Sequence, residues 1–247
     1  MPGLFGIVGT GSCHIRKQEL HQMLCSVYKG SSMVSGSYNC DEQHVYAGWT
    51  CQKGAYSDCM PIVDSGNQAV MFFAGEHYAP GEGLQLHGRY IPNNKATALL
   101  DLYLDQGESF IANLNGFFHG LIIDRVRNKV FLFNDRFGMQ RIYYVEESGA
   151  ILFSSEAKAL LAIRPSLRSF DNKGICEWIS CGAVLENRSL FEGVRVLPAA
   201  SIWSISLDSG TVKRTYFTPE VWENQDKLDI TAYFPKLQET SKKILPR

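Results

Sequence analysis

The chain opens with MPGLFGIVG (residues 1–9), in which the apolar run 4–8 is punctuated by glycines. Such a run predicts a buried β-strand that starts almost at the first residue of the chain. Residues 15–27 follow with helical periodicity, since four apolar side chains fall on one face: Leu20, Met23, Leu24 and Val27. The predicted fold therefore begins with an N-terminal strand, headed by Pro2, and an amphipathic helix.

Further strands are predicted by apolar or alternating runs along the chain: 44–50, 68–78, 117–124, 129–134, 141–145, 151–155, 201–207 and 211–217. Helices are predicted in four other places: at 95–106 between Asn94 and Gly107, at 156–162, after Asp171, and from about residue 234 with Pro235 in its first turn. The polar segment 30–39, which is rich in glycine and serine, predicts a loop.

Hairpins of strands with a few amphipathic helices predict sheets that are covered by helices, which is an α+β arrangement. The strand runs are very apolar, as expected of sheets that are buried on both faces. Past residue 218 the sequence becomes polar and rich in turn-forming residues. We therefore expect one main domain over residues 1–217, followed by a linker and a final helix over residues 218–247.

The composition narrows the class of protein. The formal net charge is −1 and like charges form no block, so we expect neither nucleic acid nor an anionic membrane as a partner. No apolar run reaches the ~18 residues of a membrane span, and no signal peptide precedes the first strand, so we expect a cytoplasmic protein. The seven cysteines are an odd number without metal-ligand spacing, which favours free thiols and predicts no metal site.

Seven short motifs follow one another along the chain: MPGLFGIVG at 1–9, YKGSS at 28–32, FFAGEHY at 72–78, LNGFFHGLIID at 114–124, NDRFGMQRIYY at 134–144, FSSEAKALL at 153–161 and SLFEGVRVLP at 189–198. Together they resemble the N-terminal glutaminase domain of asparagine synthetases, which are class II glutamine amidotransferases with an N-terminal nucleophile. The resemblance spans residues 2–217. It implies an Ntn-hydrolase-type fold, a four-layer αββα sandwich of two antiparallel sheets between helices.

The resemblance also implies a division of chemistry between two domains. In the family, the cysteine after the initiator methionine attacks the side-chain amide of glutamine and releases ammonia, which a second domain uses on an ATP-activated carboxylate. No SGGxDS-type pyrophosphate loop occurs in this sequence. We therefore expect no cofactor in this chain, with ATP and Mg²⁺ belonging to a synthetase domain that acts in cis or in trans. The sequence leaves open whether the chain forms a homodimer.

At two positions of the expected site, this chain carries a different residue from the one that reacts with or binds glutamine in the family. Pro2 stands where the family has its nucleophilic cysteine, and proline has no side chain that can form an acyl-enzyme. Lys29 stands where the family has an arginine that clamps the carboxylate of glutamine. Lysine keeps the charge but lacks the planar fork that binds a carboxylate through two parallel hydrogen bonds.

Two further positions of the expected site also differ. Ala74-Gly75-Glu76 replaces Asn-Gly-Glu, so that one of the family's two oxyanion donors is lost and only the Gly75 amide remains. Lys95 aligns with the aspartate that binds the ammonium group of glutamine, with Asn93 or Asn94 as the alternative equivalents. A lysine there would set one cation against another.

Changes in four roles of one site predict an inactive glutaminase domain, which serves as a scaffold or interaction domain for an ATP-dependent amide-forming ligase. Three alternatives remain open. Lys29, Lys95 and the Gly75 amide would together suit a small anion or an amino acid. Otherwise the chain is an active glutamine-dependent amidotransferase that uses another nucleophile, or a catalyst that uses the secondary amine of Pro2 as a base.

Two other features are interpreted as structural. Asp135-Arg136 is expected to hold its turn through a salt bridge, and His77 is expected to be a packing residue of its strand, although it lies beside Glu76.

Overall fold

The structure is a computed structural model that describes residues 3–28, 30–78, 83–86, 89–92, 96–147, 149–206 and 210–244. The chain divides into two compact units, Met1–Tyr216 and Phe217–Arg247. Within the described residues, no helix combines the length and the apolar character that crossing a membrane requires. All seven cysteines lie in the described residues and are free thiols, as predicted.

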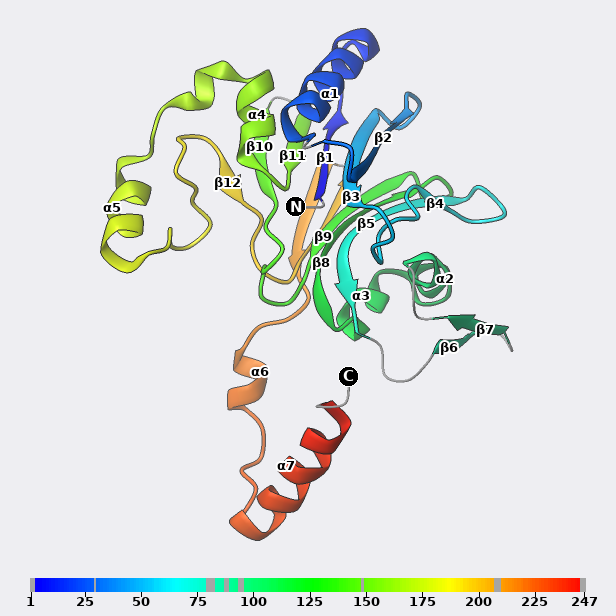
Figure 1. The fold of residues 1–247 in the computed structure, drawn as a ribbon, viewed down its shortest axis with the longest axis vertical. Helices are drawn as coiled ribbons and strands as arrows, with labels where there is room; N and C mark the ends of the chain where they lie inside the picture. The colour runs from blue at the N-terminus through cyan, green and yellow to red at the C-terminus, as the bar shows by residue number, and fades with distance from the viewer. Residues whose placement is uncertain are drawn as a thin grey trace. The chain divides into compact units, whose positions relative to one another are not determined.

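The first of two six-stranded sheets is built around β1 (Gly3–Gly9), the predicted N-terminal strand. Its strand order is β12-β10-β11-β1-β3-β2, and every pairing is antiparallel. The other strands have these bounds: β2 Met33–Cys40, β3 Val45–Gln52, β10 Tyr143–Glu147, β11 Ala150–Ser154 and β12 Arg195–Val196. β1 thus lies inside the sheet between β11 and β3, although it begins at the third residue of the chain (Figure 1).

The second six-stranded sheet is also antiparallel and has the order β14-β13-β9-β8-β5-β4. Its strands have these bounds: β4 Ile62–Val63, β5 Ala69–His77, β8 Gly116–Asp124, β9 Lys129–Asn134, β13 Ser201–Ser206 and β14 Gly210–Thr215. A separate two-stranded ribbon consists of β6 (Gly83–Leu86) and β7 (Arg89–Pro92).

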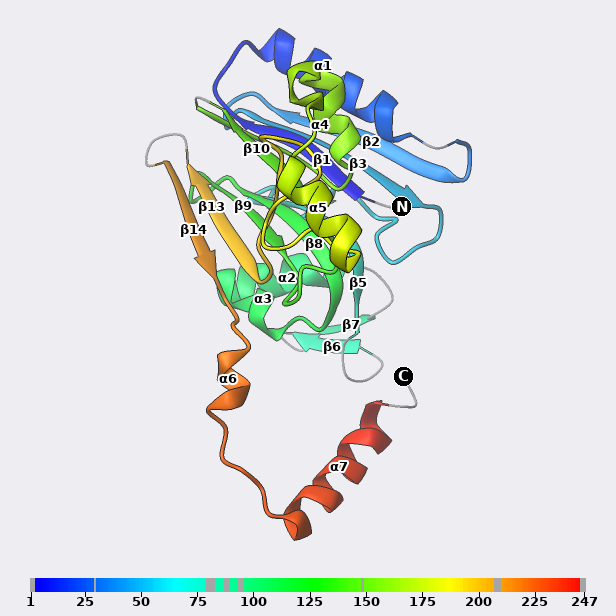
Figure 2. The ribbon, with the colours of Figure 1, turned by 90° about the vertical axis from the view of Figure 1, so that its left-hand side faces the viewer.

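The two sheets are stacked between helices, which confirms the predicted α+β sandwich (Figure 2). On the outer face of the first sheet lie α1 (Cys13–Val27) and α4 (Ala157–Ile163). On the outer face of the second sheet lie α2 (Thr97–Gln106) and α3 (Phe110–Asn113). The remaining helices have these bounds: α5 Asn172–Cys181, α6 Glu220–Glu223, α7 Ile230–Ile244, and the 3-10 turns Gly107–Ser109 and Pro165–Arg168.

The alternation of side chains along β1 shows how the sequence produces these layers. Leu4 and Val8 lie in the apolar core between the two sheets, whereas Phe5 and Ile7 pack under α1 and α4. All four side chains are buried. Because successive side chains of a strand point to opposite faces, a run that is apolar at every position is buried on both, as predicted from residues 4–8.

The predicted loop over 30–39 is wrong, because residues 33–40 form β2 at the edge of the first sheet. An edge strand is paired on one side only, so it need not carry the apolar pattern of a central strand. Gly36 is needed there because a Cβ at that position would lie 2.3 Å from the ring of Trp49 on β3. Gly36, one of the small residues that indicated a loop, is therefore what allows the tryptophan to pack across the strand.

Two predicted helix ends in the first unit are confirmed. The carboxylate of Asp171 caps α5 by accepting the backbone N–H of Gly174 at 2.7 Å. Gly107 ends α2 as predicted. Asn94, the predicted cap of α2, lies outside the described residues, and the helix itself begins at Thr97.

The predicted start of the last helix is wrong. α7 begins at Ile230 rather than near residue 234, because Asp229 caps it. One carboxylate oxygen of Asp229 accepts the N–H groups of Thr231 at 2.8 Å and of Ala232 at 2.9 Å. Pro235 consequently lies inside the helix rather than in its first turn.

Candidate functional site

A small cavity marks the beginning of β1, the position that the sequence singled out. It lies where the head of β1 meets the end of α1 and the start of α4, and it has these lining residues: Gly3, Leu4, Phe5, Val27, Thr50, Ser154, Ser155 and Glu156. Gly3 is also paired with Thr50 across the sheet. The cavity therefore adjoins the residue that follows Pro2 in the chain.

Ser155, directly after β11, holds the head of β1 in place. The backbone N–H of Leu4 donates to the Ser155 hydroxyl oxygen at 2.8 Å, and that hydroxyl lies 2.9 Å from the carbonyl oxygen of Leu4. The backbone N–H of Ser155 donates to the same carbonyl at 2.8 Å. Three hydrogen bonds therefore fix the backbone two residues beyond Pro2.

His119 on β8 connects this point to the second sheet. Its Nε2 lies 2.9 Å from the hydroxyl oxygen of Ser155, and its side chain is buried. A hydroxyl carries one proton, so when it donates to the carbonyl of Leu4, the bond from His119 must be Nε2–H donating to the oxygen. The cavity and the second sheet are thus joined through one imidazole.

Burial sets the protonation state of His119. Desolvation lowers the pKa of the imidazole to about 4, against the opposing effects of the Gln140 backbone and the nearby charge of Asp135. The ring is consequently neutral near pH 7. A neutral imidazole of such low basicity is a weak proton acceptor, so the geometry favours a positioning role for His119 over general-base chemistry.

The motif Ala74-Gly75-Glu76 at the end of β5 reaches the same region through His119. Ala74 is buried and is paired directly with His119 across the strands. Its methyl group offers no hydrogen-bond donor, in contrast to the amide that the resemblance places there. Glu76 is exposed and accepts a hydrogen bond from the hydroxyl of Tyr78 at 2.7 Å.

Gly75 keeps a backbone conformation that other residues rarely adopt. Its φ is +116°, and a Cβ at this position would lie 2.1 Å from the carbonyl oxygen of Phe117 on β8. The hydroxyl of Ser57 donates to the carbonyl of Gly75 at 3.0 Å, which fixes the peptide from the other side. The backbone conformation at this point of β5 is therefore determined by sterics, independently of the side chains on either side of Gly75.

The structure brings together part of the predicted site. Ala74, Gly75 and Glu76 are described, and His119 and Ser155 connect Ala74 to the head of β1. Pro2, Lys29 and Lys95 lie outside the described residues. Sequence reasoning did not identify His119 or Ser155 as part of the site, although both lie in quoted motifs (LNGFFHGLIID and FSSEAKALL).

Asp135, next to the buried end of β9, has the structural role that was predicted, but by a different means. Its carboxylate is fully buried and accepts backbone N–H groups at 3.0–3.3 Å from four residues: Phe118, Phe137, Met139 and Gln140. Arg136 donates to the carbonyl of Ala112 at 2.7 Å. The turn is thus held by backbone amides bound to one carboxylate.

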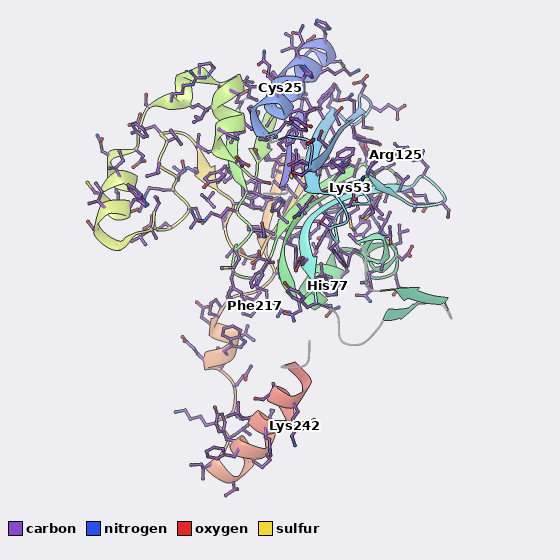
Figure 3. All side chains as sticks on the ribbon, in the orientation of Figure 1. Cys25, Lys53, His77, Arg125, Phe217 and Lys242 are labelled. Carbon is purple, nitrogen blue, oxygen red and sulfur yellow. The ribbon has the colours of Figure 1, made fainter. Side chains whose placement is uncertain are left out.

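His77 at the end of β5 is a packing residue, as predicted (Figure 3). Its Nδ1 lies 3.0 Å from the carbonyl oxygen of Asn115, and burial lowers the pKa of the imidazole. Among the described residues, no three His, Cys, Asp or Glu side chains are grouped so that they could hold a metal ion.

Comparison with known proteins agrees with this geometry. The model of the glutamine amidotransferase domain family matches residues 5–217. Asparagine synthetase [glutamine-hydrolyzing] 2 of Bacillus subtilis (strain 168) is 29% identical over 175 residues, 68% of this chain and 23% of the relative. Asparagine synthetase [glutamine-hydrolyzing] 3 of the same organism is 28% identical over 179 residues, 70% of this chain and 29% of the relative.

A solved structure extends the comparison to the fold. Glutamine phosphoribosylpyrophosphate amidotransferase from B. subtilis, complexed with ADP and GMP, superposes with a TM-score of 0.56 at 13% identity, over 87% of this chain and 49% of that one. The chain spans about a quarter of the length of the two B. subtilis synthetases. With its αββα layers, its N-terminal central strand and the family match over most of its length, the chain belongs to the glutamine amidotransferase domain family, as a class II domain of the asparagine synthetase group.

Proposed function

We propose that this domain has lost glutamine hydrolysis and serves as a scaffold or interaction domain for an ATP-dependent amide-forming ligase. The observation that carries the proposal is the side chain at position 2. Covalent amide hydrolysis needs a nucleophile at the head of β1, and Pro2 supplies none. The head of β1 is nevertheless well held, since Ser155, which is bonded to His119, fixes the backbone of Leu4.

The oxyanion motif supports the same proposal. Ala74 places a buried methyl group where the family motif carries an amide donor. Loss of one oxyanion donor costs on the order of a hundredfold or more in rate in other amide-hydrolysing enzymes. At this end of β5 the backbone N–H of Gly75 is then the one oxyanion donor of the motif that remains. We infer further that Lys29 and Lys95 no longer bind the carboxylate and ammonium groups of glutamine.

A second candidate, hydrolysis by another nucleophile, has one observation in its favour: the Ser155 hydroxyl lies 2.9 Å from an imidazole beside the cavity. That hydroxyl already bonds to the N–H and carbonyl of Leu4, and its imidazole partner is a weak base. Cys51 directly follows Thr50, which lines the cavity. Its thiol is buried and the pKa of that thiol is raised to about 11, so it is not a thiolate near pH 7.

The ligase partner is inferred from the relatives. Both B. subtilis relatives are named glutamine-hydrolysing asparagine synthetases, and each is several times longer than its match to this chain. We propose that a synthetase domain, in cis or in trans, binds ATP and Mg²⁺ and that the pair acts in the cytoplasm. In this arrangement the synthetase domain takes its nitrogen from ammonia in solution, or from another source of ammonia, instead of from the amide group of glutamine.

The test has two arms. The first measures glutamate release from glutamine by the purified chain and looks for covalent capture of a thiol-directed glutamine analogue by intact mass. We expect neither, whereas Pro2→Cys, as matched control, should capture the analogue if the frame of the site is intact. Glutamate release by the unaltered chain, removed by Ser155→Ala, would instead establish the second candidate.

The second arm concerns the ligase. In the natural polypeptide or complex that contains the synthetase domain, ammonium salts should support amide formation and glutamine should not. Equal rates with glutamine and with ammonium would contradict the proposal.

A further inference from the structure

A groove at the β12 edge of the first sheet shares no lining residue with the cavity at the head of β1. It lies between α5, the segment 182–191, the edge strand β12 and the neighbouring strand β10. It spans about 580 Å³, a volume that includes open solvent. Figure 1 shows α5 lying beyond β12, away from the stacked sheets. The groove is therefore separate from the cavity at the head of β1, whose lining residues it does not share.

The walls of the groove are held in place by a carboxylate. Glu177 on α5 forms an ion pair with Arg188, and its other oxygen accepts the backbone N–H of Leu185 at 2.9 Å. Arg188 also pairs with Glu186. Two carboxylates thus neutralise the guanidinium of Arg188 and tie the 185–188 segment to the helix, so that the groove is formed without a ligand.

Aromatic side chains line the inside of this preformed groove. Trp178 follows Glu177 on α5, lines the groove and remains 56% exposed, although helical periodicity would place it on a packed face. Tyr143 and Phe191 line the other walls. Phe191 is fixed by stacking on Phe170, with ring centroids 5.5 Å apart. A large, half-exposed indole facing a concave, aromatic surface is typical of a site for a planar apolar group.

Arg141 adds a charge to the aromatic lining. It lies between β9 and β10, lines the groove and is exposed. In the described part of the chain its guanidinium has no hydrogen bond or ion pair, in contrast to that of Arg188. A guanidinium presents its N–H groups as a planar fork that matches a carboxylate. The lining therefore combines an unpaired cation with aromatic walls.

We propose that this groove binds a small aromatic carboxylate, whose acid group pairs with Arg141 and whose ring packs on Trp178. The concave shape favours a small molecule over a flat protein surface, and the single unpaired cation favours a monoanion. The site is independent of the proposed loss of glutamine hydrolysis.

Phenylacetate is the probe for the full chain, followed by calorimetry and by the indole N–H signal of Trp178, which a Trp178→Phe variant assigns. We expect saturable binding with a shift of that signal. Phenylacetamide, which keeps the shape without the charge, should bind at least about tenfold more weakly, as expected when a hydrogen-bonded charge pair is lost.

Variants assign the two contacts. Arg141→Gln and Trp178→Ala should each weaken phenylacetate binding at least about tenfold, whereas Arg195→Gln, an exposed arginine on β12 outside the lining, should not. Both Arg141 and Arg195 are exposed, so their variants should have the melting temperature of the original chain. If Trp178→Ala does not fold, Trp178→Phe is used in its place. Absence of saturable phenylacetate binding, or equal affinity in Arg141→Gln, would overturn the proposal.

Discussion

Nε2 of His119 lies 2.9 Å from the hydroxyl oxygen of Ser155, and that hydroxyl is bonded to the backbone of Leu4. This relationship joins the two sheets at the head of the N-terminal strand. The imidazole comes from β8 in the second sheet, and the serine follows β11 in the first. The head of β1 is thus held by a short chain of polar groups that crosses between the two sheets.

Ser155→Ala should destabilise the domain, because it leaves the N–H of Leu4 and the imidazole of His119 without their shared partner. The expected loss in the free energy of unfolding is about 1–3 kcal/mol, the cost of leaving buried polar groups unpaired. Urea unfolding followed by circular dichroism measures it. Ser180→Ala, at an exposed position of α5, is the control and should change stability little; equal effects of the two variants would refute the proposed role.

Protonation of His119 should make the fold sensitive to acid. Its pKa is about 4 in the folded chain, below the ordinary value of 6.5, so between these pH values the unfolded chain binds more protons than the folded one. The contribution of the neutral ring is therefore complete above about pH 6.5 and is lost as the pH falls toward 4, by roughly 3 kcal/mol.

Comparison with His119→Gln isolates this contribution, because glutamine can donate to Ser155 but does not titrate in this range. Urea unfolding at intervals from pH 7.5 to 4.5 should show a flatter decline in the variant. His77, whose pKa burial also lowers, accounts for part of the remaining slope. Parallel pH profiles would show that His119 does not titrate with unfolding.

Gly75→Ala should be among the most destabilising single changes in the domain. The new Cβ would lie 2.1 Å from the carbonyl oxygen of Phe117, and φ is already +116°. Steric overlap added to backbone strain should cost more than about 3 kcal/mol. Gly54→Ala is the matched control, because Gly54 also has a positive φ but nothing lies within 4 Å of the added Cβ. It should cost only about 1 kcal/mol. Thermal unfolding of both variants measures the difference in stability.

Restoring glutamine hydrolysis should require more than a nucleophile. Pro2→Cys alone should capture a thiol-directed analogue but turn over glutamine very slowly, because Ala74 supplies no oxyanion donor. Adding Ala74→Asn should raise the rate by on the order of a hundredfold, the usual value of such a donor. Glutamate release is the measurement. A Pro2→Cys variant that is already as fast as the double variant would show that the amide at position 74 has no role.

Local sequence was sufficient for much of the fold. The apolar run after Pro2 predicted a buried strand, and Asp171 predicted the start of α5, because both depend on neighbouring residues and on the period of the backbone. The same local rules failed at the edge strand β2. Gly36 in that strand is explained by Trp49 on the neighbouring strand, which periodicity cannot reveal.

The sequence by itself determined one chemical fact about the expected site: residue 2 is a proline and carries no sulfur. Only the tertiary structure decided what holds the backbone of Leu4 on β1, because the bonded partners are far apart in the chain. His119 and Ser155 are 36 residues apart, and Ser155 and Leu4 are 151 apart. Burial of the imidazole between the packed sheets then lowers its pKa, a property of the assembled layers that no local pattern encodes.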